Sequence, residues 1–320
     1  MKELIIDKNN SNQRVDKFVK KYLNDAPLSF IYKLFRKKDV KINGHWCKLD
    51  AVLKENDVLR IYITDEQFSE FQGLTSIEKI PFDFEIIYED DNILVINKKQ
   101  GLLVHEDEKE KTHTLANEVL SYLFSKGEYK NGDVFKASPA HRLDRNTSGV
   151  IFFGKNVEAL QKLMELFKEK NQIEKHYLGL CVGVMPREGL IDKPLLKDAD
   201  NNLVKVVSKN NPLGKTAVTR FRVVTQFSDC ALVNIQILTG RTHQIRVHLA
   251  SIDHPIVGDA KYGNFEFNRS FEKHYGISTQ FLHSYSIKFG AVDGVLSYLS
   301  GKEFTAKLPK NLDNILQQLS

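Results

Sequence analysis

Two short segments of the chain hold an unusual density of side chains that can do chemistry. Residues 141–149 read HRLDRNTSG and bring together one carboxylic acid, Asp144, two arginines, a histidine and two hydroxyl groups, directly before an apolar run. Residues 239–249 read TGRTHQIRVHL and hold two arginines and two histidines, directly after another apolar run. Polar groups at the end of a strand either line a cleft or cap a turn, and the pattern alone leaves both interpretations open.

The second segment looks like the start of a helix. On a helix, Thr242 and Arg246 would share one face, and so would Gln244 and His248. A guanidinium is always charged, so Arg246 directed at a buried carboxylate would keep that carboxylate ionised. His243 and His248 are five positions apart with no carboxylate between them, unlike the ligands of a helical zinc motif, so we predict no metal site.

A third segment, residues 149–156, repeats the G-x4-G-K frame of a nucleotide-binding loop. Asn156 replaces the hydroxyl residue that would bind magnesium there. The four residues between the glycines are bulky and β-prone. We therefore expect a strand at this position and no nucleotide hydrolysis.

The elements that must position these residues begin with a small N-terminal unit. Apolar residues recur at helical spacing in 13–23 and again after Pro27, with lysines and arginines on the opposite faces. Asn43-Gly44 is a strong hairpin signal, and residues 58–63 alternate like a strand. The pattern predicts two basic helices and a small sheet.

Beyond residue 81 the chain changes to apolar runs typical of strands, at 84–88, 93–97, 150–153 and 232–238. Residues 156–170 predict a helix, and we assign its apolar stripe to the core and not to binding: Val157, Leu160, Leu163, Met164 and Phe167. Residues 65–80 show no clear periodicity. We therefore predict a domain at 1–64, a linker at 65–80 and one large α+β domain at 81–320.

The composition of the 320 residues, 42% hydrophobic and 27% charged, is that of an ordinary globular protein. The net charge of +5 is unevenly distributed, because ten lysines and arginines outnumber three acids between Arg14 and Lys48. This excess is either a solvated helix face or a phosphate-binding surface. Three widely spaced cysteines form no disulfide pattern, and no segment has the apolar length of a signal peptide or membrane span. We expect a cytoplasmic location and no membrane contact.

Residues 141–149 match the H-R-L-D-x-x-T-S-G motif position for position, and the chain resembles the RluA-type pseudouridine synthase family. Further segments match family motifs in the family's order and together cover nearly all of 81–290: Tyr88–Asp91 through Leu102–His105, Lys175–Tyr177, Thr239–Leu249 and His254–Asp259. The N-terminal R-x-D-K-F and V-K-I-N-G segments resemble an S4-like RNA-binding domain. Ile31-Tyr32-Lys33 and Arg36-Lys37 look closest to the RluC branch, which acts on the ribosomal large subunit.

The resemblance implies a large mixed, mainly antiparallel β-sheet with flanking helices, plus a small N-terminal S4-like α/β domain. It implies that Asp144 is the essential carboxylate, either as nucleophile at C1′ of the target uridine or as base at C2′. Tyr177 would stack on the flipped base, and Arg246 would pair with Asp144. Arg142 would enter the RNA where the uridine leaves. The other residues expected to contact RNA are Arg14, Lys17, Lys33, Arg36, Lys37, Lys38, His141 and Arg241.

The implied reaction needs no cofactor or metal, and its implied partner is large-subunit (23S) ribosomal RNA, modified by a monomer. Two alternatives stay open: the same chemistry on transfer RNA or another ribosomal site, and an RNA-binding assembly factor in which catalysis is secondary. The sequence departs from the family at Lys99, where proline is usual, and at Gly179, where alanine is common. We expect a looser turn before Gly101 and only a packing difference at Gly179.

Overall fold

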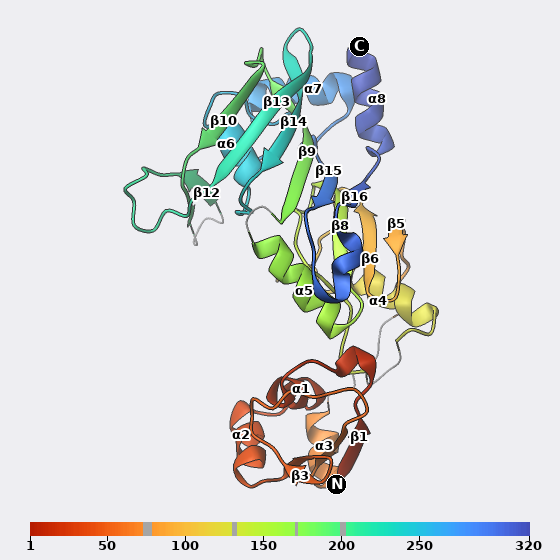
Figure 1. Ribbon diagram of the computed structural model, residues 1–320. Coiled ribbons are helices and arrows are strands. Elements are labelled where there is room, and N and C mark those ends of the chain that lie inside the picture. Colours follow the sequence, from red (N-terminus) through yellow and green to blue (C-terminus); the bar gives the residue numbers. More distant parts are fainter. Residues whose placement is uncertain (73–78, 130–132, 170–171, 199–202) are drawn as a thin grey trace.

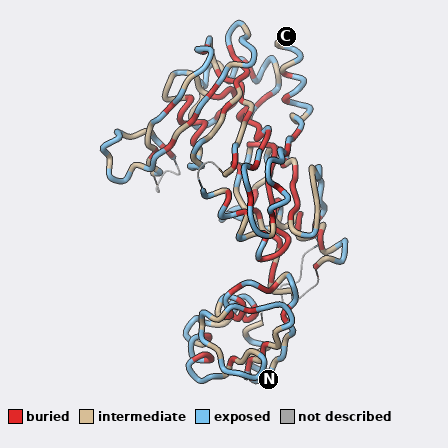
Figure 2. The backbone as a smooth tube through the Cα atoms, viewed as in Figure 1, coloured by how far each residue is buried: buried red, intermediate tan, exposed pale blue. Residues whose placement is uncertain are grey.

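The structure is a computed structural model that describes residues 1–72, 79–129, 133–169, 172–198 and 203–320. A small N-terminal unit lies at one end of a larger unit built around one long sheet (Figure 1). Buried residues concentrate along the strands of that sheet and in the middle of the N-terminal unit (Figure 2). Within the described ranges, no helix combines the length and the apolar character that crossing a bilayer requires.

The N-terminal unit has the two helices and the small sheet that the sequence predicts. Its four-stranded sheet has the order β1-β4-β2-β3, and the apolar faces of both long helices are buried. Asn43 and Gly44 have positive φ angles of 50° and 82° and close the predicted hairpin. The elements are β1 (Lys2–Ile5), η1 (Lys8–Asn10), α1 (Val15–Tyr22), α2 (Leu28–Arg36), β2 (Val40–Ile42), β3 (His45–Trp46) and β4 (Val58–Ile61).

The start of the expected linker is instead a helix, α3 (Asp65–Phe71). Thr64 caps it through a reciprocal pair of hydrogen bonds with Gln67. Phe68 and Phe71 pack on the N-terminal core, with ring centroids 5.5 Å from Tyr22 and 4.6 Å from Phe30. Two apolar residues in seven are too few to produce a visible helical period, so the sequence did not indicate a helix at 65–71. Residues 73–78 of that linker lie outside the described residues.

The large unit is the mixed, mainly antiparallel sheet that the sequence predicts. Its main path has the order β10-β13-β14-β9-β15-β8-β6-β5, and β7 and β16 join it at the side. The β8–β15 pair is parallel, and the other recorded pairs of this sheet are antiparallel. The strands are β5 (Glu85–Glu89), β6 (Ile93–Lys98), β7 (Ser138–Pro139), β8 (Ser148–Gly154), β9 (Ile173–Val182), β10 (Glu188–Asp192), β13 (Val218–Gln226), β14 (Cys230–Ile237), β15 (Leu282–Phe289) and β16 (Glu303–Thr305). A separate hairpin consists of β11 (Leu195–Asp198) and β12 (Leu203–Val206).

Helices cover both faces of this sheet, so its central strands are apolar on both sides. In β8, Ile151 and Phe153 face one core with α4, while Val150 and Phe152 face another with α5. This double burial is why the strand appears in the sequence as a continuous apolar run. The flanking helices are α4 (Leu115–Ser125), α5 (Val157–Lys168), α6 (Gln244–Ala250), α7 (Phe265–Tyr275), α8 (Lys310–Leu319) and the 3-10 helix η2 (Gly294–Leu299).

The apolar stripe of α5 is only partly core. Val157 and Leu163 are buried, as predicted, but Met164 is 53% exposed. Met164 and Phe167 line a cavity that also contains Asp144. Assigning the whole stripe to the core is therefore wrong, because helical spacing alone does not distinguish a face against the sheet from a face against a cavity.

Gly149, the last residue of the HRLDRNTSG segment, sets where that segment lies. Its φ is +113°, and a Cβ atom there would lie 2.1 Å from the carbonyl oxygen of Ser284. Only glycine tolerates this conformation and this contact. The close approach of β8 and β15 at this point places Asp144 at the edge where the two parallel strands begin.

Candidate active site

Asp144 lies in a turn and also faces a cavity, so both interpretations of its segment hold. The Thr147 amide donates to the Asp144 carbonyl oxygen at 3.0 Å, which closes the turn before β8. The carboxylate does not cap this turn. Its Oδ2 accepts a hydrogen bond from Nη1 of Arg246 at 2.9 Å, and about 23% of the side chain stays exposed.

A second carboxylate fixes Arg246 in place. The Arg246 Nε and Nη2 atoms donate to the two oxygens of Asp259 at 2.6 and 2.8 Å, and Asp259 is completely buried. Burial alone would raise the pKa of the Asp259 carboxyl, but the guanidinium, with the amides of Lys261 and Tyr262, holds that pKa below its usual value. Asp259 therefore fixes the position of the charged guanidinium that binds Asp144.

Helix α6 begins later than the sequence suggests. It starts at Gln244, after His243 in the left-handed conformation with φ 51°. Thr242 precedes the helix, so the expectation that Thr242 and Arg246 share a helical face is wrong. Gln244 and His248 do share one, because both side chains bond to the Thr219 hydroxyl.

His248 uses both ring nitrogens within the protein. Its Nδ1 lies 2.8 Å from the Thr219 hydroxyl and its Nε2 lies 2.9 Å from the Lys193 carbonyl oxygen. His243 lies at the site itself. His248 is therefore bound to groups within the protein, whereas His243 lies beside Asp144. The two side chains do not form a pair of metal ligands.

His243 is a site residue that the sequence reasoning missed. Its Nε2 lies 3.9 Å from Oδ2 of Asp144 and its Nδ1 lies 2.9 Å from the Tyr262 hydroxyl, which also accepts from the Val204 amide. Burial lowers the pKa of His243, against the opposing effect of Asp144. The left-handed backbone at His243 turns this side chain toward Asp144, and only the structure shows it.

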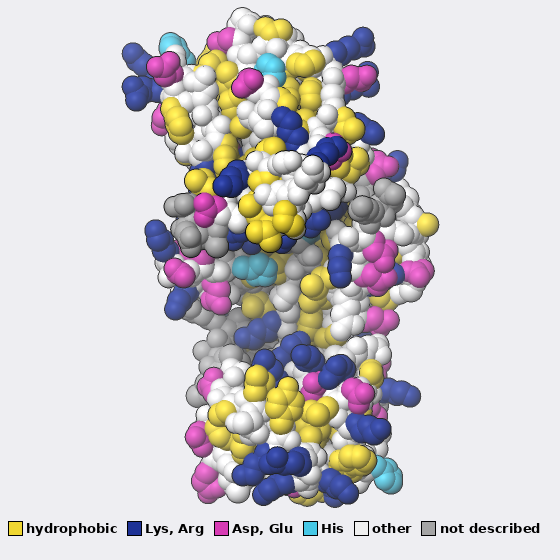
Figure 3. Space-filling model, turned by 90° about the vertical axis from the view of Figure 1, so that its left-hand side faces the viewer, with side chains coloured by type: hydrophobic (Ala, Val, Ile, Leu, Met, Phe, Trp, Pro, Cys, Tyr) yellow, Lys and Arg dark blue, Asp and Glu magenta, His cyan; other side chains and the backbone are white. Residues whose placement is uncertain are grey.

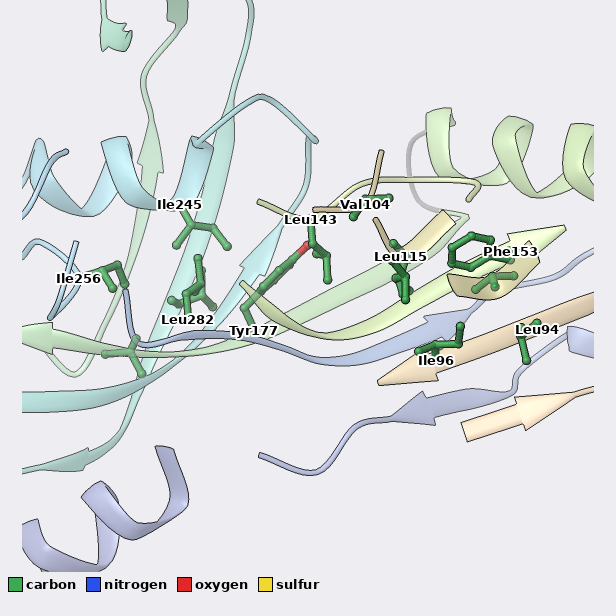
Figure 4. Packing of buried hydrophobic residues seen from close by; sticks show 14 of the residues in the cluster. Leu94, Ile96, Val104, Leu115, Leu143, Phe153, Tyr177, Ile245, Ile256 and Leu282 are labelled. Carbon is green, nitrogen blue, oxygen red and sulfur yellow. The ribbon is translucent and has the colours of Figure 1, made fainter. Parts of the chain in front are cut away.

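Tyr177 of β9 lies in the wall of the cavity beside Asp144. It is 8% exposed, and Figure 4 shows its ring between Leu282 and Leu143, with Ile245 nearby. Burial raises the pKa of the Tyr177 hydroxyl to about 12, so the group stays protonated in neutral solution. The ring offers a fixed aromatic surface next to the carboxylate.

Two hollows meet at Asp144. The first has a volume of about 410 Å³ and a wall that includes Tyr177, Ile237 and Leu282. The second, of about 470 Å³, has a more polar wall that includes His105 and Lys261. Lys and Arg side chains surround the hollowed middle of this face and continue onto the N-terminal unit (Figure 3).

The predicted RNA-contacting residues fall into two groups in the structure. Arg142 and Arg241 are exposed at the first hollow, and Arg241 Nε donates to the Thr216 carbonyl oxygen at 3.0 Å. His141 is half-buried at the same hollow. The others lie on the N-terminal unit, away from Asp144, and are exposed there: Arg14, Lys17, Lys33, Arg36, Lys37 and Lys38.

The turn before Gly101 is anchored, and the expectation of a looser turn is wrong. Lys98 is completely buried, and its Nζ donates to the carbonyl oxygens of Lys99 at 2.7 Å and Arg145 at 2.9 Å. Gln100 donates to the Asn146 carbonyl oxygen at 3.2 Å. Both side chains tie the turn to the Asp144 loop. A lysine in an apolar run gave no sequence signal for this role.

Two other sequence expectations are confirmed. Residues 149–154 lie in strand β8, and Lys155 pairs with Glu89 and Glu128 at 3.0 and 2.7 Å, so the G-x4-G-K frame forms no phosphate loop. At Gly179 a Cβ atom would lie 2.9 Å from Cδ1 of Ile235. The larger neighbours fill the space that alanine would occupy, which is a packing difference.

The mixed sheet carries an arginine-held carboxylate beside a buried tyrosine, at the place where two hollows meet. The chain belongs to the RNA pseudouridylate synthase family, whose model matches residues 92–251, and the RluA-type resemblance is confirmed. It is thus a pseudouridine synthase.

Two curated relatives carry the name ribosomal large subunit pseudouridine synthase C. The protein from Vibrio cholerae is 34% identical over 89% of this chain and 87% of its own length. The one from Escherichia coli is 33% identical over 90% of this chain and 88% of its own length. The solved structure of human RNA pseudouridylate synthase domain containing 4 covers 73% of this chain and 92% of its own, with a TM-score of 0.59 and 26% identity.

Proposed function

We propose that this enzyme converts specific uridines of large-subunit ribosomal RNA to pseudouridine. The observation that carries the proposal is the partly exposed Asp144 carboxylate held by Arg246 in the wall of two hollows. The names of the curated relatives support the choice of ribosomal RNA as substrate. The site is built from one chain, so a monomer is sufficient for it. We assign the enzyme to the cytoplasm because its proposed substrate is ribosomal RNA.

The chemistry begins with extrusion of the target uridine, since an enzyme cannot reach a stacked base. The C1′–N1 bond then breaks and uracil leaves with the bonding electrons. The Asp144 carboxylate either bonds to C1′, in which case C5 later displaces it, or removes the C2′ proton and returns it once C5 has bonded to C1′. Uracil turns within the hollow, C5 bonds to C1′, C5 loses its proton and N1 gains one. Atoms and electrons balance, so neither an oxidant nor a cofactor enters the scheme.

The neighbouring residues each have a part in this scheme. Tyr177 stacks on the extruded base, since its ring is fixed in the wall of the same hollow as Asp144. Arg246 orients the Asp144 carboxylate through the hydrogen bond from Nη1. Arg142, exposed at the rim, occupies the place that the uridine leaves, and Arg241 binds a phosphate.

The N-terminal unit is an S4-like RNA-binding module in this proposal. Its two basic helices, the order of its elements and its exposed cations support that assignment. Because α3 packs on the N-terminal core, we extend the module from residue 64 to residue 71 and begin the catalytic domain at residue 81.

Asp144→Asn tests the central claim. We expect the variant to bind large-subunit RNA with unchanged affinity and to form no pseudouridine, measured by carbodiimide labelling and primer extension. Normal turnover by the variant would show that the role of Asp144 is wrong. Ribosomal RNA from a deletion strain should lack specific pseudouridine stops. Loss of stops in transfer RNA instead would favour that substrate, and unchanged stops with impaired subunit assembly would favour an assembly factor.

A further inference from the structure

The first hollow extends past the catalytic groups onto the last turn of α5. Its wall there consists of Met164, Phe167 and Lys168, with Lys175 from β9. Pockets of roughly 300–1,000 Å³ hold whole drug-sized ligands. The volume of about 410 Å³ is therefore larger than one pyrimidine ring against Tyr177 needs.

The α5 end of the hollow has a flat aromatic wall. The His141 ring stacks on the Phe167 ring with centroids 4.1 Å apart and an interplanar angle of 22°. The Phe152 amide donates to Nε2 of His141 at 3.2 Å, which fixes the imidazole. Burial lowers the pKa of His141 to about 3, so the ring is neutral and acts as an aromatic surface, not as a cation for phosphate.

Met164 adds an apolar surface that the protein itself does not cover. Its side chain is 53% exposed, while Leu163 and Leu166 on the same helix are buried against the sheet. Two cations stand beside it. Lys168 is exposed, and Lys175 Nζ lies 5.4 Å from the centre of the Phe167 ring. Flat apolar groups next to cations are what proteins use to hold the bases and phosphates of single strands.

The position of α5 fits an RNA strand that leaves the active site. The helix ends at the hollow, and near its beginning Glu158 accepts a hydrogen bond from Asn12 of the N-terminal unit at 2.9 Å. A strand bound at Asp144 and at the N-terminal cations therefore has α5 along its path (Figure 1). The nucleotide next to the target uridine meets the last turn of α5 first.

We propose that Met164 and the Phe167–His141 ring pair form a second base-binding site, which holds the base of a nucleotide adjacent to the target uridine. Lys168 binds the phosphate of that nucleotide. The inference rests on the proposed function, because it requires an RNA substrate. It adds a specificity element, since the base next to the modified uridine then contributes to recognition.

Met164→Ala tests this site, with Gln161→Ala as control, because Gln161 is exposed on the same helix but does not line the hollow. The substrate is a fragment of the large-subunit RNA around a mapped pseudouridine. We expect about 5-fold weaker binding for Met164→Ala, the low end of the range for losing one stacked base because the aromatic rings remain, and no change for Gln161→Ala. Met164→Leu should retain most of the affinity. Equal affinities for the two alanine variants would overturn the proposal.

A fragment with an abasic residue on either side of the target completes the test. On the side of the target whose base contacts Met164, the missing base should weaken binding to the original enzyme. It should not weaken binding to Met164→Ala any further, because both changes remove the same contact. Additive losses on both sides would refute the second site. Failure of the original enzyme to form any pseudouridine in large-subunit RNA would instead refute the proposed function, so the two failures are distinguishable.

Discussion

Asp259 binds Arg246 through two hydrogen bonds, with its carboxylate oxygens 2.6 and 2.8 Å from Nε and Nη2 of the guanidinium. The remaining nitrogen, Nη1, reaches Asp144 at 2.9 Å. The Arg246 guanidinium also lies 5.2 Å from the Tyr262 ring centre. One arginine thus has a buried carboxylate that orients it and a partly exposed carboxylate that it orients in turn.

Asp259→Asn should reduce the rate of the chemical step by roughly 10²-fold, because a small displacement of Arg246 moves Asp144 from its reactive position. RNA affinity should change little, since Asp259 is completely buried. Single-turnover kinetics and filter binding on the same RNA separate the two effects. A wild-type single-turnover rate would show that Asp259 does not position the site.

The same substitution should change the acid stability of the protein. The pKa of Asp259 is lowered in the folded state, so the charged carboxylate contributes stability above its usual pKa of about 4. That contribution is lost as the pH falls through the lower, folded-state value. Urea unfolding from pH 7 down to pH 3 should therefore show a shallower acid loss for Asp259→Asn than for the original protein. Parallel curves would contradict this assignment.

Replacing the whole ion pair should separate stability from catalysis. Arg246→Ala leaves Asp259 buried and unpaired, which costs about 3–5 kcal/mol, whereas Arg246→Met with Asp259→Leu removes both charges and should be close to neutral in unfolding free energy. Both variants should lose turnover, because Asp144 has lost its guanidinium. Denaturant unfolding combined with single-turnover assays measures this. An active double variant would show that Asp144 needs no arginine.

The sequence predicted the elements that bury apolar residues with a regular period. The two N-terminal helices, the strands β5, β6, β8 and β14 and the Asn43-Gly44 hairpin follow from local patterns, and the structure confirms them. Helix α3 was missed because only Phe68 and Phe71 face the core. Packing of that helix depends on contacts with Tyr22 and Phe30, which are distant in the sequence.

The sequence predicted the site residues that belong to a recognisable motif. It did not predict the residues whose contacts form only when distant segments fold together. Asp144 and Arg246 were named from two motifs, and the structure brings them together across 102 positions. Asp259 lies in a matched segment, but no role was assigned to it from the sequence. His243 was considered only as a metal ligand. Their places depend on a left-handed turn and a buried ion pair, and neither has a local sequence pattern.

Charge reversal on α2 and the turn after it should weaken RNA binding and flatten its salt dependence. The residues to change are Lys33, Arg36, Lys37 and Lys38, each to Glu; all four are exposed. Each lost phosphate contact lowers the slope of log K against log salt by about 0.9 for a duplex or about 0.7 for a single strand.

Reversal of Arg269 and Lys273, which are both exposed on α7 near the opposite end of the molecule, is the control (Figure 1). The control should leave the slope unchanged. Binding titrations between 50 and 200 mM salt measure both variants on the same large-subunit RNA, in the range where phosphate contacts dominate affinity. Identical slopes for the α2 variant and the original protein would show that these cations do not contact phosphates.

Lys98→Met should change how stability depends on pH in the alkaline range. Burial lowers the pKa of Lys98 to about 7, whereas an unfolded lysine titrates near 10.4. Between these values the unfolded chain binds more protons than the folded one, so stability rises with pH. A neutral amine still has two N–H groups for the carbonyl oxygens of Lys99 and Arg145. Methionine fills similar space without titrating, so its unfolding free energy should lack this rise between pH 7 and 9. The same rise in both proteins would show that Lys98 is charged throughout, and that the Asp144 loop is anchored by an ammonium.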